Sequence, residues 1–286
     1  MGEKVFRQGL EGSGVSEQSF PPRIHAIIAR DKNVGIVIRR GPSKHVATFL
    51  WDLNKDTFKI GQWLKGKIYA RRCDISRDGK YFLYFAMADK RQRKAASTWT
   101  ALSRAPYLKA LDFYPKGDAW EGGGLFLQNR KYFLNDRYYL KQDAERRTSG
   151  LECVTGVRAE HAHGAECLSI YFPRLIRDGW IRIEQQNNSF IFEKPASQGW
   201  TLRKISHAGG NKKLGGSYWD EHQLESSNGK RLSYPDWEWA DVNKKTIIFA
   251  ENGKLFRVKL TKEDVLKPKA LEDFSKYTFE PIQAPY

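Results

Sequence analysis

Short runs of alternating hydrophobic and polar residues, separated by turn residues, fill most of the chain. The stretch "CDISRDGKYFLYFAMA", residues 73–88, places Asp78-Gly79 between two such runs. Glycine supplies the positive φ that a tight turn needs, so this dipeptide predicts a β-hairpin. The runs "STWTALSRAP" and "LKALDFYP" follow, which completes a unit of four predicted strands.

The same arrangement recurs along the chain. First-to-second-strand turns are predicted near residues 32, 78, 129, 178 and 243, at intervals of about 46, 51, 49 and 65 residues. Four-stranded units repeated at this period are typical of a β-propeller. We therefore predict an all-β fold, a five-bladed β-propeller of four-stranded antiparallel blades. The residues expected in or beside the turns are Asp31, Asp78, Asn129, Asp178 and Asn243.

Two motifs resemble the WD-repeat and related propeller superfamilies. "DISRDGKYFLYF" is similar to the "SPDGKxLxF" turn between the first two strands of such repeats. "FLWDL" contains Trp51-Asp52, which resembles the dipeptide that closes the third strand of a WD repeat, whereas the Gly-His partner of that repeat is missing. The resemblance implies an architecture and no subfamily.

The repeat also predicts the domain organisation. Residues 1–22 carry Gly, Ser and Glu without periodicity and are expected to form a flexible N-terminal arm. A single propeller domain follows over 23–286, with blades at about 23–66, 67–117, 118–167, 168–210 and 211–286. Trp51, Trp99 and Phe192 are predicted core residues.

The composition indicates in which compartment the protein resides and which kinds of partner it could bind. The net charge is +16, so an anionic partner such as nucleic acid is plausible on charge alone. No apolar run approaches the ~18 residues of a membrane span, and the N-terminus lacks the apolar segment of a secretory signal. Three cysteines are too few for a disulfide scaffold. These features favour a cytoplasmic protein with no membrane partner.

Basic residues gather in two predicted loops. Equivalent second-to-third-strand connections of adjacent blades emerge on the same face of a propeller, so cations in both loops would share one sector. Such a rim could follow a phosphate backbone; the alternative is a solvated surface. The candidates are Arg39, Arg40 and Lys44 in the first blade and Lys90, Arg91, Arg93 and Lys94 in the second.

Cysteine and histidine residues occur together in the segment after the third predicted turn. Thiolate and imidazole groups are zinc ligands, and four can close a tetrahedral site. The spacing Cys-x7-His-x-His-x3-Cys lacks the usual Cys-x2-Cys pair, so no metal is favoured. The weak candidates are Cys153, His161, His163 and Cys167. Whether residues 136–167 form a ligand site or a disordered loop is left open by the sequence.

Two groups of acidic residues raise enzymatic alternatives. In "YWDEH", strand alternation would place Asp220 and His222 on one face and Glu221 on the other. Glycoside hydrolysis needs two carboxyl groups at a defined separation. The acids expected on innermost strands are Asp74, Glu121, Asp236 and Glu238, while the first blade offers His25.

These observations lead to a first functional hypothesis. No phosphate-binding Gly-x4-Gly-Lys-Ser/Thr, zinc-protease His-Glu-x2-His or nucleophile Gly-x-Ser-x-Gly motif is placed for chemistry. We expect a non-catalytic binding module without a cofactor, whose partner is a protein, with nucleic acid as the second candidate. The alternative is a glycan-processing or metal-assisted hydrolase that uses the central funnel.

Overall fold

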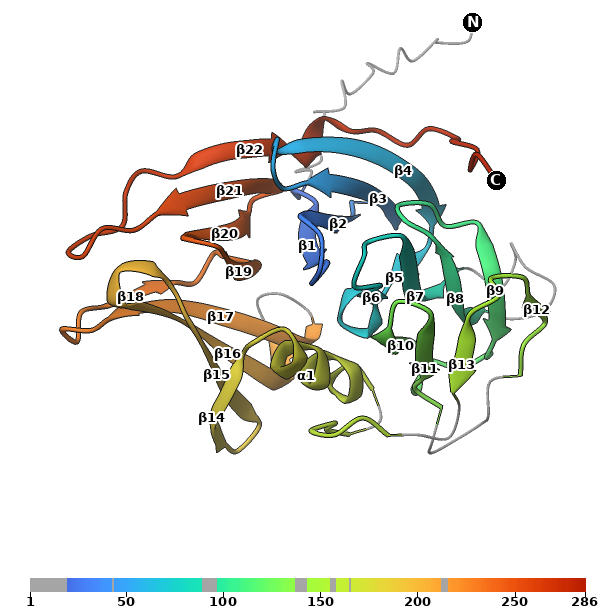
Figure 1. The fold of residues 1–286 in the computed structure, drawn as a ribbon, viewed down its shortest axis with the longest axis horizontal. Helices are drawn as coiled ribbons and strands as arrows, with labels where there is room; N and C mark the ends of the chain where they lie inside the picture. Colours follow the sequence, from blue (N-terminus) through green and yellow to red (C-terminus); the bar gives the residue numbers. More distant parts are fainter. Residues whose placement is uncertain are drawn as a thin grey trace, which may run out of the picture.

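A computed structural model of the chain describes residues 20–286, apart from residues 43, 89–96, 137–142, 155–157, 165 and 212–215. Five β-sheets surround a common axis (Figure 1). The predicted fold class, an all-β five-bladed β-propeller, is confirmed. The predicted N-terminal arm lies almost wholly outside the described residues, so it stays a prediction.

The first and fifth sheets follow the predicted plan of four antiparallel strands in chain order. Their central strands are rich in Ile, Val and Phe, which suit a pleated surface buried on both faces. The first sheet comprises β1 (Arg23–Ile28), β2 (Val34–Arg40), β3 (His45–Asp52) and β4 (Thr57–Lys65). The fifth comprises β19 (Trp239–Asn243), β20 (Thr246–Glu251), β21 (Lys254–Lys259) and β22 (Lys269–Asp273).

The second sheet has an interrupted inner edge. β5 (Lys67–Ile68) and β6 (Asp74–Ile75) both pair with β7 (Tyr81–Met87), and the short 3-10 helix η1 (Ala70–Arg72) separates them. This interruption brings Arg71 and Arg72 to the axis, where Arg71 contacts Tyr218 of the fourth sheet and Arg72 contacts Ala119 in the connection before the third sheet. The sheet continues through β8 (Thr98–Arg104) and β9 (Ala110–Pro115) to β12 (Arg146–Arg147).

The third sheet is the smallest. It contains β10 (Gly124–Gln128), β11 (Lys131–Leu134) and β13 (Glu152–Val154), and β13 pairs with β11 in parallel. The glycines before β10 allow a close approach to the second sheet, because a Cβ on Gly123 would lie 2.1 Å from the Arg72 carbonyl oxygen. The turn signals at Asp31, Asp78, Asn129 and Asn243 are confirmed, since each lies in or beside the expected connection.

The fourth unit differs from the sequence prediction. The segment expected to be its first strand forms α1 (Leu168–Arg177), and Asp178 ends this helix instead of lying in a hairpin turn. Leu168, Tyr171, Phe172 and Leu175 recur at i, i+3, i+4 and i+7, the helical period, and together they bury one face. Gly179, at φ 90°, follows the helix end in the left-handed conformation that favours glycine there.

The fourth sheet begins only after this helix. It runs through β14 (Ile181–Gln186), β15 (Ser189–Pro195), β16 (Trp200–Asn211), β17 (Gly216–Ser226) and β18 (Arg231–Tyr234). The blade boundary expected at residue 210 falls inside the β16–β17 hairpin, because β17 and β18 continue the antiparallel ladder of β16. The fourth sheet therefore extends to Tyr234.

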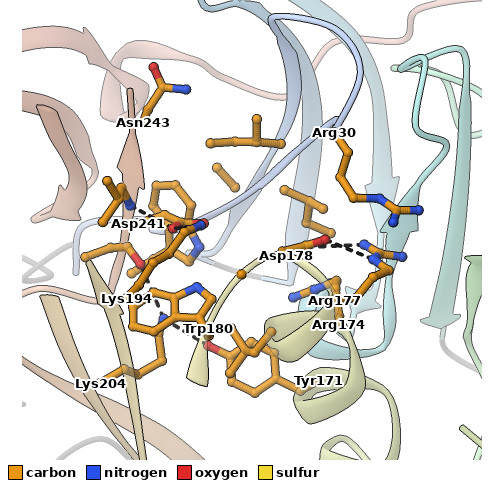
Figure 2. Close-up of a pocket in the computed structure, with 18 of the residues that line it drawn as sticks. Arg30, Tyr171, Arg174, Arg177, Asp178, Trp180, Lys194, Lys204, Asp241 and Asn243 are labelled. Atoms are coloured by element: carbon orange, nitrogen blue, oxygen red, sulfur yellow. Dashed lines mark hydrogen bonds and ion pairs between the residues drawn. The ribbon is translucent and has the colours of Figure 1, made fainter. Parts of the chain in front are cut away.

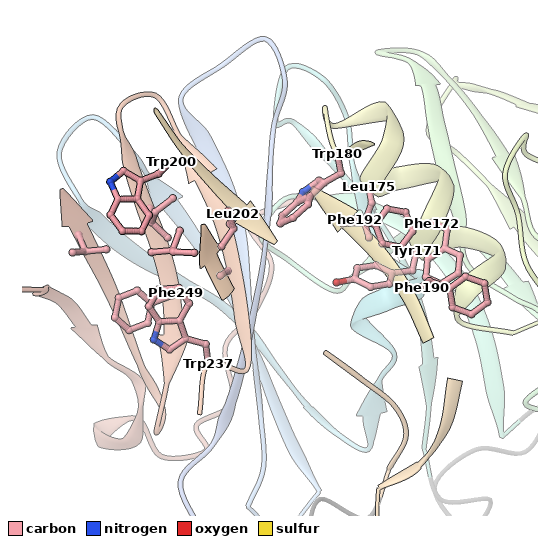
Figure 3. Close-up of a cluster of buried hydrophobic side chains, with 14 of the residues drawn as sticks. Tyr171, Phe172, Leu175, Trp180, Phe190, Phe192, Trp200, Leu202, Trp237 and Phe249 are labelled. Atoms are coloured by element: carbon pink, nitrogen blue, oxygen red, sulfur yellow. The ribbon is translucent and has the colours of Figure 1, made fainter. Parts of the chain in front are cut away.

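The largest part of the core lies between α1, the fourth sheet and the fifth sheet (Figure 3). Phe172 packs against both Phe190 and Phe192, with ring centroids 4.7 and 4.9 Å apart. Burying a side chain of this size stabilises the fold by about 1.5–3 kcal/mol. The predicted core residues Trp51, Trp99 and Phe192 are fully buried. In the described part of the chain, no helix is long and apolar enough to span a membrane.

Candidate functional site

A cavity of about 390 Å³ lies beside the propeller axis. Its walls come from β1, from α1 and the residues directly after it, from β15 and β16, and from β19. Figure 2 shows polar and charged side chains from all of these elements around the same space. We call this cavity the axial pocket. The charged side chains that line it are Arg30, Arg174, Arg177, Lys194, Lys204 and the acids Asp178 and Asp241.

Lys204 is the most deeply buried of these charges. It stands on β16 in the inward phase set by Trp200 and Leu202, and its side chain is 1% exposed. Its Nζ donates to Tyr171 Oη at 3.2 Å and to the Ala240 carbonyl at 3.3 Å. It also lies 4.8 Å from the centroid of the Trp180 ring (Figure 2).

A buried carboxylate holds this part of the pocket together. Tyr171 Oη donates to Asp220 Oδ2 at 2.7 Å, and Arg71 Nη2 lies 3.0 Å from the same oxygen. Asp220 and His222 share the buried face of β17, as strand alternation predicts, whereas Glu221 lies on the other face. The 3-10 helix η1, the helix α1 and the paired strands β16 and β17 therefore converge on one charged network.

Burial shifts the pKa of each member of this network. It lowers the pKa of Lys204 to about 8, because Asp220 and Asp241 only partly offset the loss of water. It also raises the pKa of Tyr171 well above its usual value, so the phenol stays protonated. The pKa of Asp220 is held well below its usual value by Arg71 and Lys204, against the effect of burial. Lys204 is thus an amine that can change its protonation near neutral pH.

A second charged group closes the other side of the pocket. Arg177 contacts the buried Asp74 through both terminal nitrogens, at 2.5 and 2.9 Å, and donates to Asp178 through Nε at 2.9 Å. One guanidinium therefore binds two carboxylates. Burial raises the pKa of Asp178, and Arg177 opposes that shift. Across the pocket, Lys194 Nζ donates to Asp241 Oδ1 at 2.8 Å.

The predicted inner-strand acids differ in their partners and in their exposure. Asp74 accepts from the Phe126 amide as well as from Arg177. Glu238 accepts from the Ile24 amide at 2.8 Å, and burial raises its pKa. Asp236 is exposed, and Glu121 is buried beside the third sheet. His25 Nε2 accepts from Arg174 Nη2 at 3.0 Å, and burial keeps the pKa of His25 well below the usual value.

The predicted basic rim is only partly described. Arg39 is buried and donates to the carbonyls of Phe274 and Tyr277, so it joins β2 to the segment that follows β22. Arg40 lies at the axis, where burial and Arg71 lower its pKa to about 10, and Lys44 is exposed. The remaining candidates, Lys90, Arg91, Arg93 and Lys94, lie outside the described residues, and anion binding at this rim stays a prediction.

The four weak metal candidates lie in different surroundings. Cys153 is next to the buried Tyr114 and Tyr132, and Cys167 Sγ accepts from Arg72 Nε at 3.4 Å. The His163 ring packs on Phe190 with centroids 4.6 Å apart, and His161 is exposed. Among the residues that the structure describes, no group of three or more His, Cys, Asp or Glu side chains is placed to hold a metal ion.

The sequence contained two signals for the pocket that our interpretation did not use. Lys204 occupies an apolar-phase position of "WTLRKIS", where a charge is unexpected. Tyr171, Arg174 and Asp178 are spaced i, i+3 and i+7, which would align them on one helix face. Reading the segment as a strand separated these residues and hid the second signal.

Comparisons with known proteins identify no family. No family model matches the chain, and no curated protein matches it. Among solved structures, the GH43 protein BlXynB from Bacillus licheniformis aligns at 11% identity and a TM-score of 0.34, over 91% of this chain. This chain spans only 56% of that protein's length. A chain of the mitotic checkpoint complex aligns at 8% identity and a TM-score of 0.31, over 98% of this chain and 91% of its own length.

A polysaccharide lyase of family PL25, an ulvan lyase, also aligns, at 7% identity and a TM-score of 0.20, over 91% of this chain and 75% of its own. These matches include a GH43 protein and a polysaccharide lyase and give no support to the prediction of a non-catalytic binding module, which we withdraw. At such identities the likeness concerns the fold alone, so the chemistry has to be taken from the axial pocket.

Proposed function

We propose that the protein is a glycan-processing enzyme and that the axial pocket is its active site. The volume of about 390 Å³ lies in the range of small-molecule sites. The walls combine the aromatic side chains of Trp180 and Trp239 with several hydrogen-bonding groups. A sugar ring presents both an apolar face and a rim of hydroxyl groups, and this combination suits it.

The observation that carries the proposal is the state of Lys204. An acid–base group works best when its pKa lies near the working pH, and burial brings the pKa of this lysine to about 8. Tyr171 and the Ala240 carbonyl fix the position of Nζ at the pocket wall. Lys204 would transfer the proton, while Tyr171 and Asp220 act as positioning residues.

Carboxylates are less suited to this role in the pocket. Asp178 shares Arg177 with Asp74, and Asp241 is bound by Lys194. These charge-assisted hydrogen bonds engage oxygens of both carboxylates, so protein cations already occupy the groups that a substrate hydroxyl would have to reach. The proposal therefore assigns acid–base work to the amine.

The test is a cleavage assay with the purified full-length chain. A panel would contain neutral polysaccharides (arabinan, xylan and barley β-glucan) and acidic ones (polygalacturonate, hyaluronan and ulvan). New chain ends would be measured by a reducing-sugar assay and the products by mass spectrometry. We expect products from at least one polysaccharide. A panel in which every polysaccharide stays intact between pH 6 and pH 9 would overturn the proposal.

A further inference from the structure

We propose that the axial pocket takes an anionic saccharide, whose carboxylate or sulfate is bound by Arg30, Arg174 and Lys204. This inference rests on the proposed function and names the class of its substrate. The shared chemistry is a charged oxygen group attached to a sugar ring. Its basis is the balance of charge around the pocket.

Fixed positive charge exceeds negative charge at this site. Four of the cations lie against carboxylates: Arg177 against Asp74 and Asp178, Lys194 against Asp241, and both Arg71 and the more distant Lys204, at 3.9 Å, against Asp220. The pocket and its buried network contain six cations and four carboxylates, so two positive charges remain in excess. The cations are Arg30, Arg71, Arg174, Arg177, Lys194 and Lys204, and the carboxylates are Asp74, Asp178, Asp220 and Asp241.

Arg174 is a buried cation with neutral partners. Its side chain hydrogen-bonds to the carbonyl oxygens of Ala70 and Cys73 and to the neutral ring of His25. In the described part of the chain no carboxylate forms an ion pair with it. Burying a charge is costly unless an opposite charge compensates it. Because Arg174 lines the pocket, an anionic ligand could supply that compensation.

Arg30 offers a further positive charge on the Arg177 side of the pocket (Figure 2). It follows β1, is exposed, and extends toward the Arg177 side of the pocket in Figure 2. Arg177 lowers its pKa and the carboxylates of Asp178 and Asp74 raise it, so it lies within the field of the same charged group. Arg30 and Arg174 therefore present guanidinium groups from separate elements, β1 and α1, to one cavity.

The pKa of Lys204 should change when a charged ligand binds. The groups that face it are Asp220 and His222 from β17, Asp241 from β19, Arg71 from η1, and Tyr171, Arg174 and Trp180 from α1 and its end. A bound anion favours the ammonium form and raises its pKa. Binding should then take up a proton, and affinity should fall up to tenfold per pH unit as the pH rises above about 8.

The experiment measures binding of four probes to the full-length protein at pH 7 by titration calorimetry. The probes are D-glucuronate, D-glucose 6-sulfate, D-glucose and inorganic sulfate. We expect at least one of the two charged sugars to bind tenfold or more tightly than both D-glucose and inorganic sulfate; which one does so distinguishes the carboxylate from the sulfate. Arg30→Gln should weaken charged-sugar binding about tenfold, whereas the exposed control Arg231→Gln, on the outer hairpin, should leave it unchanged.

Two results would overturn the inference. If D-glucose binds as tightly as the charged sugars, or if no probe binds at all, the pocket does not select an anionic sugar. If inorganic sulfate binds as tightly as D-glucose 6-sulfate, the site recognises a bare anion and the sugar class is wrong. Cleavage of a neutral polysaccharide together with either result would show that the enzyme proposal holds while this inference fails.

Discussion

At the scale of one residue, the burial of the Lys204 amine lowers the stability of the fold. Its neighbours in the inward phase of β16, Leu202 and Ser206, are uncharged and fully buried. Its pKa is about 8 in the folded chain against 10.5 for a solvated lysine. A charge kept in such a position is more easily explained by chemistry at the pocket than by folding.

Replacing Lys204 by Met should stabilise the protein at pH 7. The pKa of this lysine is lowered on folding, so the unfolded chain binds more protons between about pH 8 and 10.5, and wild-type stability gains with pH there. The difference in pKa corresponds to about 3 kcal/mol. We expect Lys204→Met to exceed the wild type in free energy of unfolding by up to about this amount at pH 7 and by much less at pH 10.5.

Urea denaturation of both proteins at the two pH values measures this difference. The control is Lys262→Met, which changes an exposed lysine and should shift the free energy of unfolding by less than about 0.5 kcal/mol. A Lys204→Met protein that is less stable than the wild type at pH 7 would mean that the lysine's contacts outweigh its desolvation.

At the scale of elements, local sequence signals are sufficient to predict the turns but not to predict the pocket. Asp78-Gly79 determines a turn by its own backbone preference, so the sequence predicts it without the rest of the fold. The segment 168–177 carries an apolar pattern that strand and helix can both accommodate, and packing against the fourth sheet decides in favour of α1. The pocket joins β1, α1, β16 and β19, a proximity that no local pattern encodes.

α1 should depend on the contact between Arg177 and Asp74. Asp74 has no exposed side-chain surface, so Arg177→Met would leave a buried carboxylate without its cation. Breaking such a pair costs about 3–5 kcal/mol, and we expect the free energy of unfolding to fall by that amount. Adding Asp74→Asn to the same protein should restore part of the loss, because it removes the unpaired charge.

Chemical denaturation of the single and double variants tests this coupling. Arg231→Met, which breaks the exposed pair with Glu225, should cost at most about 1 kcal/mol. If Arg177→Met were as stable as this control, the contact with Asp74 would not anchor α1.

At the scale of the whole molecule, side-chain contacts join the two ends of the ring. Among the strands that the structure describes, the first and fifth sheets share no hydrogen-bonded ladder. Arg257 pairs with Asp56 at 2.6 Å, and Glu238 accepts from the Ile24 amide. Arg39 of β2 donates to the carbonyls of Phe274 and Tyr277, directly after the fifth sheet. A residue read from sequence as part of an anion-binding rim thus contributes to ring closure.

Replacing Arg39 by Met should loosen this closure. Two charge-assisted hydrogen bonds to the segment after β22 would be lost, and hydrogen bonds of this type contribute about 1.5–3 kcal/mol each. We expect a fall of about 3 kcal/mol in the free energy of unfolding and faster amide hydrogen exchange over residues 274–286. Exchange in that segment at the wild-type rate would contradict a closing role for Arg39.

The most direct test of the glycan-processing site compares Lys204→Met with Lys262→Met in the cleavage assay. Both changes remove one ammonium group, but only the first reaches the axial pocket. Loss of a positioned acid–base group lowers rates by about 10²–10⁴-fold. We expect a loss of that size for Lys204→Met, with cooperative unfolding retained, and wild-type cleavage for Lys262→Met. Equal cleavage by the two variants would contradict the assignment of the active site to the axial pocket.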